Sequence, residues 1–359
     1  MSDWFNKVVR IESIIKHPDA DNLSIALTTA GDYPIVIRTE DYKVGDLAAY
    51  ISIDSVLPDT EEFHSLTPVV RDVAGNILGR KYVVGSTPEH VRVVKARRLR
   101  KIYSQGLLWK IPETFVLDQD VTEHFGLTKV EEDEEDTCLS EKKKKYVQDE
   151  FNPEGWSAPF YDIEGVRKYS SAFDNQEVYV SEKCHGANGA FCHDGNNLWC
   201  KSRNHFKRGI ISFTDAEGIV NNIESTDQWW FCARKLNLAE KLIKYPLHVF
   251  FGEVIGQVGG FSYDASKENP TVKFFDIWDV KNQCYLQYVD FKRICKELEL
   301  PIVPELYVGI WNKDLIFKIA EGNTTLGKQN HVREGVVIKT TTGDRTCFKL
   351  VGEGYNLKK

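Results

Sequence analysis

The sequence predicts an α+β protein with two domains, and three features of the chain support this prediction. Short β-rich segments separated by turn residues fill the N-terminal third. A highly charged stretch follows at residues 131–145, and beyond it longer strands alternate with helices. We therefore expect a small β-barrel domain at residues 1–125, a charged linker at 126–150, and a larger domain with antiparallel sheets and flanking helices at 151–359.

Length and charge narrow the class of protein. With 359 residues, 42% of them hydrophobic, the chain is longer than a single core usually supports. Lys and Arg total 46 against 53 Asp and Glu, so the net charge of −7 gives no global attraction to nucleic acid or to an anionic membrane. No apolar run approaches the ~20 residues of a membrane span, and the N-terminal MSDWFNKVVR lacks a signal-peptide core. We expect no membrane partner and a cytoplasmic or otherwise intracellular location.

The eight cysteines point to the same compartment. They form neither a CxxC pair nor a Cys/His cluster with zinc spacing. Buried free thiols in a reducing environment are the expected result.

The first domain reads as a series of short strands, which suits a small closed barrel. Its segments are VVRIESIIKH, LSIALTTAGDYPIVIRT, DLAAYISIDS, RKYVVG and VRVVKARRLRKI. The last of these carries a dense group of cations between Arg92 and Lys101, with Tyr103 close by. Such a segment is typical either of a track for a nucleic-acid backbone or of an edge strand protected by charge.

The charged stretch EEDEEDTCLSEKKKK is too polar to pack, which is why we place the linker there; it forms either a solvated segment or a binding tail. Beyond it, strands are predicted at 178–181, 187–200 with a turn at DGNN, 247–254, 272–280, 334–340 and 346–351. Helical periodicity appears at 223–244, 288–299 and 313–320.

Six short stretches of the second domain carry polar residues that a strand alone does not need. They occur in the order EKCHGAN (182–188), KSRN (201–204), FFGEVIG (250–256), FFDIWD (274–279), EGVVIK (334–339) and CFKLVG (347–352). Together they resemble the collinear motifs of the covalent nucleotidyltransferases, the superfamily of ATP-dependent RNA and DNA ligases and mRNA capping enzymes. The form KxHGxN is similar to that of the RNA ligases.

The remainder of the chain resembles one stand-alone RNA ligase family in particular. HPDADNL (17–23) and KVGDLAAYISIDSVLP (43–58) are similar to segments of OB-fold barrels, and YDIEGVRKY (161–169) is also family-like. The resemblance implies an ATP-dependent RNA ligase that seals 5′-phosphate and 3′-hydroxyl ends. In that reaction Lys183 takes AMP from ATP, passes it to the 5′-phosphate, and the 3′-hydroxyl then displaces AMP.

The chemistry explains why carboxylates and a metal accompany this lysine. Only the neutral amine attacks, and deprotonating an ordinary lysine at pH 7 costs roughly 4 to 5 kcal/mol. Glu253 and Glu334 would raise that cost, whereas a divalent cation about 5 Å away repels an ammonium by roughly 6 kcal/mol at an effective dielectric of ~20. The resemblance therefore implies Mg²⁺ or Mn²⁺ held by Glu253 and Glu334, with His185 as a further ligand of the metal or its water.

The resemblance also assigns contacts to the nucleotide. Phe275 would stack on the purine, although its neighbour Phe274 competes for that role, and Gly186 would let the backbone pass close to the nucleotide. The other expected contacts are Glu182 to the adenine amino group, Asn188 and Arg203 to the phosphate and ribose, Glu253 and His185 beside the phosphates, Lys339 and Lys349 to the triphosphate, and Arg167 in the outer shell. Many family members have KxK in the last motif, but the positions two residues from Lys349 are Cys347 and Val351 here, so only Lys349 can be carried over and the phosphate that it contacts stays open.

The implied partners are RNA ends, in a nicked duplex or a broken RNA, together with enzymes that heal such ends. Two alternatives remain. A DNA ligase or capping-type enzyme usually has an OB domain after the last motif, whereas only residues 350–359 follow Lys349 here. A non-catalytic RNA-binding protein with an OB domain would retain the motifs without transferring AMP.

Overall fold

The computed structural model divides the chain into two compact units. The described residues are 4–58, 60–66, 69–71, 77–80, 93–130, 159–203, 205–214, 220–256, 261, 263–328 and 331–357. The N-terminal unit comprises Met1–Leu139, Gly165–Ser170 and Asn356–Lys359, and the C-terminal unit comprises Ser140–Glu164 and Ser171–Tyr355. The predicted linker lies outside the described residues from residue 131 onward.

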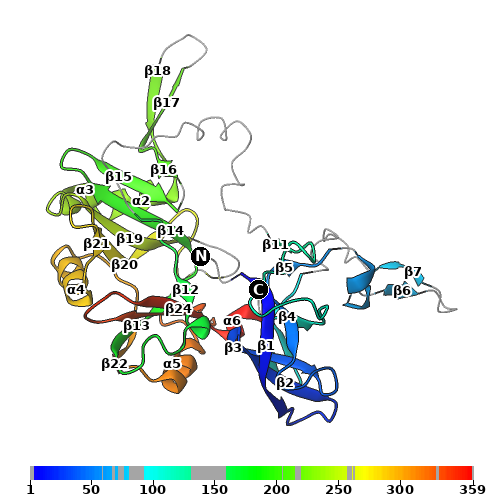
Figure 1. Ribbon diagram of the computed structural model, residues 1–359. Coiled ribbons are helices and arrows are strands. Elements are labelled where there is room, and N and C mark those ends of the chain that lie inside the picture. The colour runs from blue at the N-terminus through cyan, green and yellow to red at the C-terminus, as the bar shows by residue number, and fades with distance from the viewer. Residues whose placement is uncertain are drawn as a thin grey trace. The chain divides into compact units, whose positions relative to one another are not determined.

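A five-stranded antiparallel sheet forms the centre of the N-terminal unit (Figure 1). Its order is β10-β4-β1-β2-β3, with β1 Asn6–Lys16, β2 Leu23–Thr28, β3 Gly31–Arg38, β4 Leu47–Ile51 and β10 Leu107–Trp109. Val8 and Val9 are both fully buried, in separate clusters that contain Ile51 and Tyr50 respectively. Successive side chains point to opposite faces, so this sheet has a core on each side. The edge strands β3 and β10 also contact each other, as in a barrel.

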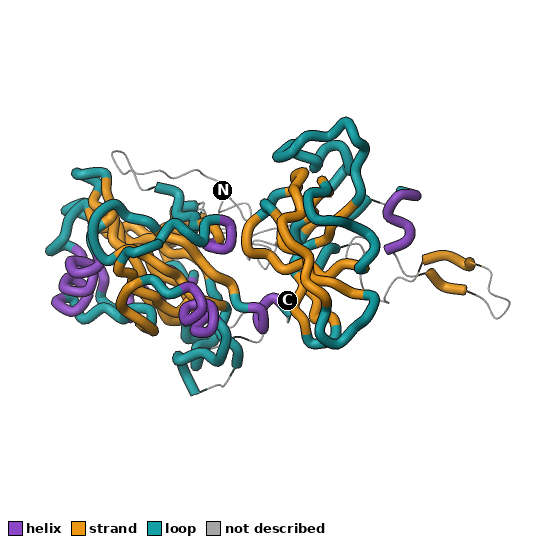
Figure 2. Tube along the Cα trace, turned by 60° about the horizontal axis from the view of Figure 1, so that its bottom comes forward, coloured by secondary structure: helices purple, strands orange, loops and turns teal. Residues whose placement is uncertain are grey.

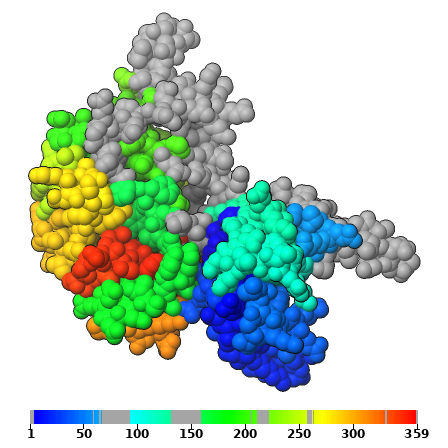
Figure 3. Space-filling model, in the orientation of Figure 1, coloured from blue at the N-terminus to red at the C-terminus, as the bar shows by residue number. Residues whose placement is uncertain are grey.

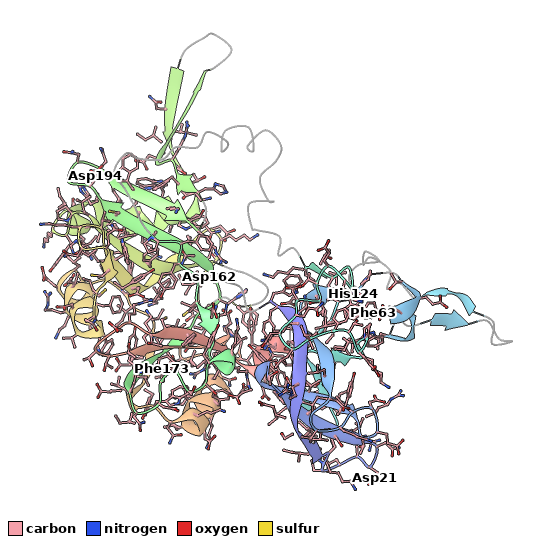
Figure 4. The ribbon with its side chains drawn as sticks, viewed as in Figure 1. Asp21, Phe63, His124, Asp162, Phe173 and Asp194 are labelled. Atoms are coloured by element: carbon pink, nitrogen blue, oxygen red, sulfur yellow. The ribbon has the colours of Figure 1, made fainter. Side chains whose placement is uncertain are left out.

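Shorter elements complete this unit. They are β5 Ser55–Val56 paired with β11 Thr128–Lys129, β6 Val69–Arg71 paired with β7 Ile77–Arg80, η1 Glu61–Leu66 and η4 Val166–Lys168. Phe63 of η1, labelled beside His124 in Figure 4, is buried and packs on Phe125 with ring centroids 5.8 Å apart.

The predicted basic segment forms a hairpin. β8 (Arg97–Leu99) pairs with β9 (Ile102–Ser104), and the two turn residues, Arg100 and Lys101, have φ of 44° and 73°. Glycine or asparagine is usual in such a turn, because other side chains are strained there. All residues from Arg97 to Lys101 are exposed, whereas Arg92 lies outside the described residues.

The C-terminal unit contains two antiparallel sheets. The first has the order β12-β24-β23-β13-β22, with β12 Glu164–Gly165, β13 Glu177–Lys183, β22 Glu305–Ile310, β23 Gly335–Thr340 and β24 Cys347–Val351. Helix α5 (Lys313–Ala320) packs on β23 and β24 and begins where the side chain of Asn312 accepts a hydrogen bond from Leu315 N. Figure 3 shows the C-terminal strands in red, between a yellow and a green segment of the unit.

The second sheet is six-stranded, in the order β16-β15-β14-β19-β20-β21. Its strands are β14 Ala187–His193, β15 Leu198–Ser202, β16 Phe206–Lys207, β19 His248–Ile255, β20 Thr271–Asp279 and β21 Cys284–Tyr285. The helices are α2 Gln228–Lys235, α3 Leu238–Leu242, α4 Tyr288–Glu297 and, near the C-terminus, α6 Glu353–Asn356. A hairpin of β17 (Ile210–Thr214) and β18 (Val220–Glu224) extends from this sheet (Figure 1).

One face of the six-stranded sheet carries the main core. Phe191, Phe250 and Phe274 pack there against residues of α2, α3 and α4. Figure 2 shows in orange how strands dominate the fold, with few helices in purple. The opposite face carries a second cluster around Phe251, with Phe275 and Tyr161 packed against it.

The predicted elements are largely confirmed. The six predicted strand segments correspond to β13, the β14–β15 hairpin, β19, β20, β23 and β24, and two of the predicted helices to α4 and α5. The helix expected at 223–244 begins only at Gln228, because residues 223 and 224 belong to β18. Strand β22 was not predicted. The cysteines of the described part are free, as expected, but Cys284 is exposed rather than buried. No helix among the described residues is long and apolar enough to cross a membrane.

Candidate active site

Lys183 is the last residue of β13, and strand register fixes the direction of its side chain. Lys183 lies beside Gly335, and Tyr179 lies beside Lys339, which in turn lies beside Cys347 of β24. Residues two apart on a strand share a face. Lys183, Lys339 and Lys349 therefore point to one side of the five-stranded sheet, which we call the Lys183 face.

Glu334 immediately precedes β23 and holds the Lys183 side chain. Lys183 Nζ donates a hydrogen bond to Glu334 Oε1 at 2.6 Å. Burial alone would lower the pKa of Lys183, but Glu334 and Glu253 outweigh it, so the pKa of Lys183 is raised. Burial would raise the pKa of Glu334, but Lys183 and His185 lower it. The protein alone therefore keeps this lysine as an ammonium ion.

Glu253 of β19 adds a second carboxylate. It accepts a hydrogen bond from the Gly186 backbone N–H, and burial together with Glu334 raises its pKa to about 8, against the opposing effect of Lys183. Gly186 has no room for a side chain, because a Cβ would lie 2.5 Å from Val254 O and 3.1 Å from Glu253 Cγ. This glycine is thus needed for the close approach of the EKCHGAN segment to β19.

The two carboxylates fit a divalent cation. Glu334 Oε2 is buried without a hydrogen-bond partner among the described residues, so the lone pairs of this oxygen are not used by them. No group of three or more His, Cys, Asp or Glu residues gathers in the described part of the chain as a complete metal cage. A site with few carboxylates suits Mg²⁺, which keeps several of its waters.

His185 is held by aromatic residues. Its Nδ1 lies 2.8 Å from the Tyr355 hydroxyl and 3.8 Å from Glu334 Oε2, and its backbone N–H donates to the Tyr263 hydroxyl at 2.9 Å. Phe261 packs edge-on against the imidazole with centroids 5.1 Å apart. None of these three aromatic residues lies in a motif, so sequence reasoning missed them.

Glu182 lies on the opposite face from Lys183, and its exposure is 1%. Its Oε1 accepts a hydrogen bond from the Thr324 hydroxyl, and its Oε2 accepts one from Thr325 N at 2.9 Å and another from Thr325 Oγ1 at 2.7 Å. Both carboxylate oxygens are therefore bound to protein groups. The structure does not bring Glu182 together with the other predicted nucleotide contacts, and sequence reasoning missed the two threonines.

Lys339 is also more buried than predicted. Its Nζ donates to Phe275 O at 2.7 Å and to Asp276 Oδ2 at 2.8 Å, and its exposure is only 3%. The same Asp276 oxygen accepts from Arg345 Nη2 at 2.5 Å and from the Tyr161 hydroxyl at 2.8 Å. Burial would raise the pKa of Asp276, but the two cations lower it. Lys339 thus ties β23 to β20 through two hydrogen bonds of its ammonium group.

The two neighbouring phenylalanines have different surroundings. Phe274 is fully buried in the main core beside Phe191 and Phe250. Phe275 is half-buried next to Tyr161, with ring centroids 4.9 Å apart, near the Lys339 end of the site. Only Phe275 has a ring surface available to a ligand.

The other predicted contacts are dispersed. Asn188 lies beside Glu253 in the sheet and accepts a hydrogen bond at its backbone carbonyl from Trp229 Nε1 at 3.0 Å. Arg203 is exposed, with Nη2 3.4 Å from an oxygen of Asp162, which is labelled in Figure 4. Lys349 is half-buried on the Lys183 face. Arg167 belongs to the N-terminal unit, where its Nη1 donates to Asp32 O at 3.0 Å.

Comparisons with known proteins agree with this geometry. The model of the RNA ligase family matches residues 176–351, and a model of an OB-fold domain matches residues 5–111. No curated protein matches the sequence.

Solved structures share the whole fold at low sequence identity. They include a Naegleria gruberi RNA ligase mutant with ATP and Mn (TM-score 0.74, 23% identity, 99% of each chain covered). Another mutant of that ligase, with AMP and Mn, has a TM-score of 0.72 at 21% identity and covers 99% of this chain and 98% of that one. The same ligase with PPi has a TM-score of 0.70 at 21% identity and covers 98% and 97%.

The match of the RNA ligase model spans every strand from β13 to β24, including Lys183 and Glu334, and the OB-fold model spans the N-terminal sheet. Residues 176–351 therefore form a domain of the RNA ligase family, and an OB-fold domain precedes it in the chain.

Proposed function

We propose that the protein is an ATP-dependent RNA ligase that joins 5′-phosphate and 3′-hydroxyl ends through a lysyl-AMP intermediate on Lys183. The observation that carries this proposal is the half-buried Lys183 at the end of β13, 2.6 Å from Glu334 and coupled to Glu253. The similar Naegleria gruberi RNA ligase has been solved with ATP and Mn, with AMP and Mn, and with PPi. These ligands support ATP as the nucleotide and a divalent cation as its companion.

The reaction proceeds in three steps, and in each step a nucleophile attacks a phosphorus atom. The lone pair of neutral Lys183 Nζ forms a bond to the α-phosphorus of ATP, the bond from that phosphorus to the bridging oxygen breaks, pyrophosphate leaves, and the nitrogen gives one proton to water. A 5′-phosphate oxygen of RNA then takes the adenylate from Lys183. Finally the 3′-hydroxyl attacks the adenylylated 5′-phosphate, AMP leaves, and a phosphodiester bond is formed.

The residues present explain why a cation is required. The two carboxylates raise the pKa of Lys183 and so oppose its role as a nucleophile. Glu334 and Glu253 would hold Mg²⁺ or Mn²⁺, and His185 would bind the ion through one of its waters. When bound, such an ion offsets the charge of the carboxylates and of the triphosphate.

The nucleotide contacts follow from exposure. We assign Phe275 to stacking on adenine, Asn188 and Arg203 to the phosphate and ribose side, and Lys349 to the triphosphate. We assign Glu182 and Lys339 a positioning role, since the charged group of Glu182 is bound to Thr324–Thr325 and that of Lys339 to Asp276.

The N-terminal unit would bind RNA through its basic hairpin. Arg97, Arg98, Arg100 and Lys101 are all exposed, and the strained turn keeps two of these cations at its tip. Clustered exposed cations bind phosphates without regard to sequence.

The chemistry also limits the substrate and its source. Ends other than 5′-phosphate and 3′-hydroxyl would need conversion by end-healing enzymes before joining, in nicked duplexes as in broken RNA. We place the protein inside the cell, because its described cysteines are free thiols of the kind found in reducing compartments.

The decisive experiment incubates the protein with α-labelled ATP and Mg²⁺. We expect the label on Lys183 and nowhere else, found by mass spectrometry of the digested protein, and no label on Lys183→Ala or Lys183→Arg. A label on another residue, or none on the wild type, would contradict the proposal. Sealing of nicked duplexes with RNA or DNA at the 3′-hydroxyl side then gives the polymer preference.

A further inference from the structure

The face of the six-stranded sheet that carries Glu253 extends outward through β15 to the edge strand β16. Asn188 lies beside Glu253, and Ala190, two residues further along β14, lies beside Lys201. Because residues two apart on a strand share a face, the side chain of Lys201 lies on the Glu253 side of the sheet. Strands are about 4.8 Å apart, so β15 lies about 10 Å from β19.

Phe206 of β16 stands next to Lys201 on this face. The two residues are paired in the sheet, and Lys201 Nζ lies 5.6 Å from the centroid of the Phe206 ring. Both side chains are half-buried. The pair therefore presents a positive charge and an aromatic ring side by side at the margin of the site.

The charge of Lys201 is not compensated by an acidic residue in the described part of the chain, where it forms no ion pair. Its neighbour Arg203 differs, because Asp162 lies 3.4 Å away. Burial lowers the pKa of Lys201, as expected for a cation that has lost water without gaining a carboxylate. A phosphate would supply the missing negative charge.

We propose that Lys201 and Phe206 bind one nucleotide of the RNA strand close to the ends being joined, with Lys201 on a backbone phosphate and Phe206 stacked on the base. This inference rests on the proposed ligase function. The strand of Lys201 lies about 10 Å from the strand of Glu253, a separation that suits a nucleotide next to the ends being joined. Stacking on an aromatic ring and a point charge on a phosphate both tolerate any sequence.

Lys207 provides a matched control. It also lies over an aromatic ring, 4.4 Å from the centroid of Trp229, and it is in the same strand pair. Its register partner is Cys200, which is buried in the main core, so Lys207 lies on the opposite face. A non-specific effect of removing a lysine would appear in both variants.

The test measures three quantities in Lys201→Gln, Phe206→Leu and Lys207→Gln: lysyl-AMP formation without RNA, RNA affinity over a range of salt, and single-turnover transfer of AMP to 5′-phosphate RNA. For Lys201→Gln we expect lysyl-AMP formation within about twofold of wild type, about tenfold weaker RNA binding, and a salt slope reduced by about 0.7. Phe206→Leu should weaken binding about tenfold with the salt slope unchanged. Lys207→Gln should behave as wild type.

Two results would overturn the inference. One is an equal loss of lysyl-AMP formation and of transfer in Lys201→Gln, which would place Lys201 at ATP. The other is equal weakening of RNA binding by Lys201→Gln and Lys207→Gln. An absence of lysyl-AMP on the wild type would instead defeat the proposed function, and the RNA-binding comparison would still decide the role of Lys201.

Discussion

The cations of the β8–β9 hairpin and those of the Lys183 face have opposite surroundings. Arg97, Arg98, Arg100 and Lys101 are exposed and lie close together in the first strand and the turn of a hairpin. Lys183 and Lys339 are buried or half-buried and each is within 3 Å of a carboxylate oxygen. The comparison shows that the role of a lysine depends on its burial and on its partners, and not on its residue type alone. Four changes test this contrast.

The largest effect is expected where a partner controls a buried amine. Glu334→Gln removes the charge that raises the pKa of Lys183, so without metal the amine should react with an amine-modifying reagent at a lower pH than in wild type. Lysyl-AMP formation with Mg²⁺ should nevertheless fall by about 10² to 10³, because the charge that would hold the cation is lost. If modification of Lys183 keeps its pH dependence, Glu334 does not control this amine.

Lys339→Met should act on stability. The change leaves Asp276 buried with only Arg345 as a charged partner, and loss of one member of a buried ion pair costs about 3 kcal/mol. Lys349→Met on the same sheet face is the control and should cost less than about 1 kcal/mol in the free energy of unfolding. Urea unfolding measures both, and equal values would show that Lys339 is not a structural cation.

Changes in the β8–β9 hairpin should instead appear in the salt dependence of RNA binding. Replacing Arg97, Arg98, Arg100 and Lys101 together by Gln should reduce the slope of log Kd for RNA against log salt by about 3. Lysyl-AMP formation should stay near the wild-type rate, because these residues belong to the other unit. A loss of adenylylation equal to the loss of RNA binding would count against a separate role for the hairpin.

The smallest effect separates strain from charge in the turn. Lys101→Gly relieves a left-handed position and should stabilise the protein by up to about 1 kcal/mol. Its ion pair with Asp19, at 3.9 Å and largely exposed, offsets little of that gain. RNA binding should weaken severalfold at low salt, so thermal unfolding and RNA affinity would move in opposite directions.

Much of the fold could be predicted because its strands have clear limits. The motif strands β13, β19, β20, β23 and β24 are apolar runs bounded by turn residues, and they were placed within a few residues. Strand β22 was missed because its apolar residues do not alternate with polar ones, and two of them, Val308 and Ile310, are exposed at 42% and 60%. Such a strand is held by its neighbour β13 rather than by its own pattern.

The candidate site residues could be named from the sequence, but their surroundings could not. The resemblance of EKCHGAN and EGVVIK to ligase motifs singled out Lys183 and Glu334, and the structure joins these two residues by a hydrogen bond. The sequence could not show that Lys339 is paired to Asp276, because the two are 63 positions apart and meet only when the sheets pack. The same reason explains the missed partners Tyr263 and Tyr355 of His185 and the missed threonines of Glu182.

The pairing of β13 with β23 has a consequence for how this segment can change. Glu182 and Lys183 are adjacent, yet Glu182 is bound by threonine hydroxyls on one face of the sheet and Lys183 is bound by Glu334 on the other. Inserting or deleting a single amino acid upstream within β13 would exchange the faces of the two residues and place an acid where the amine now lies. The strand should therefore accept substitutions in its apolar positions but no change in length.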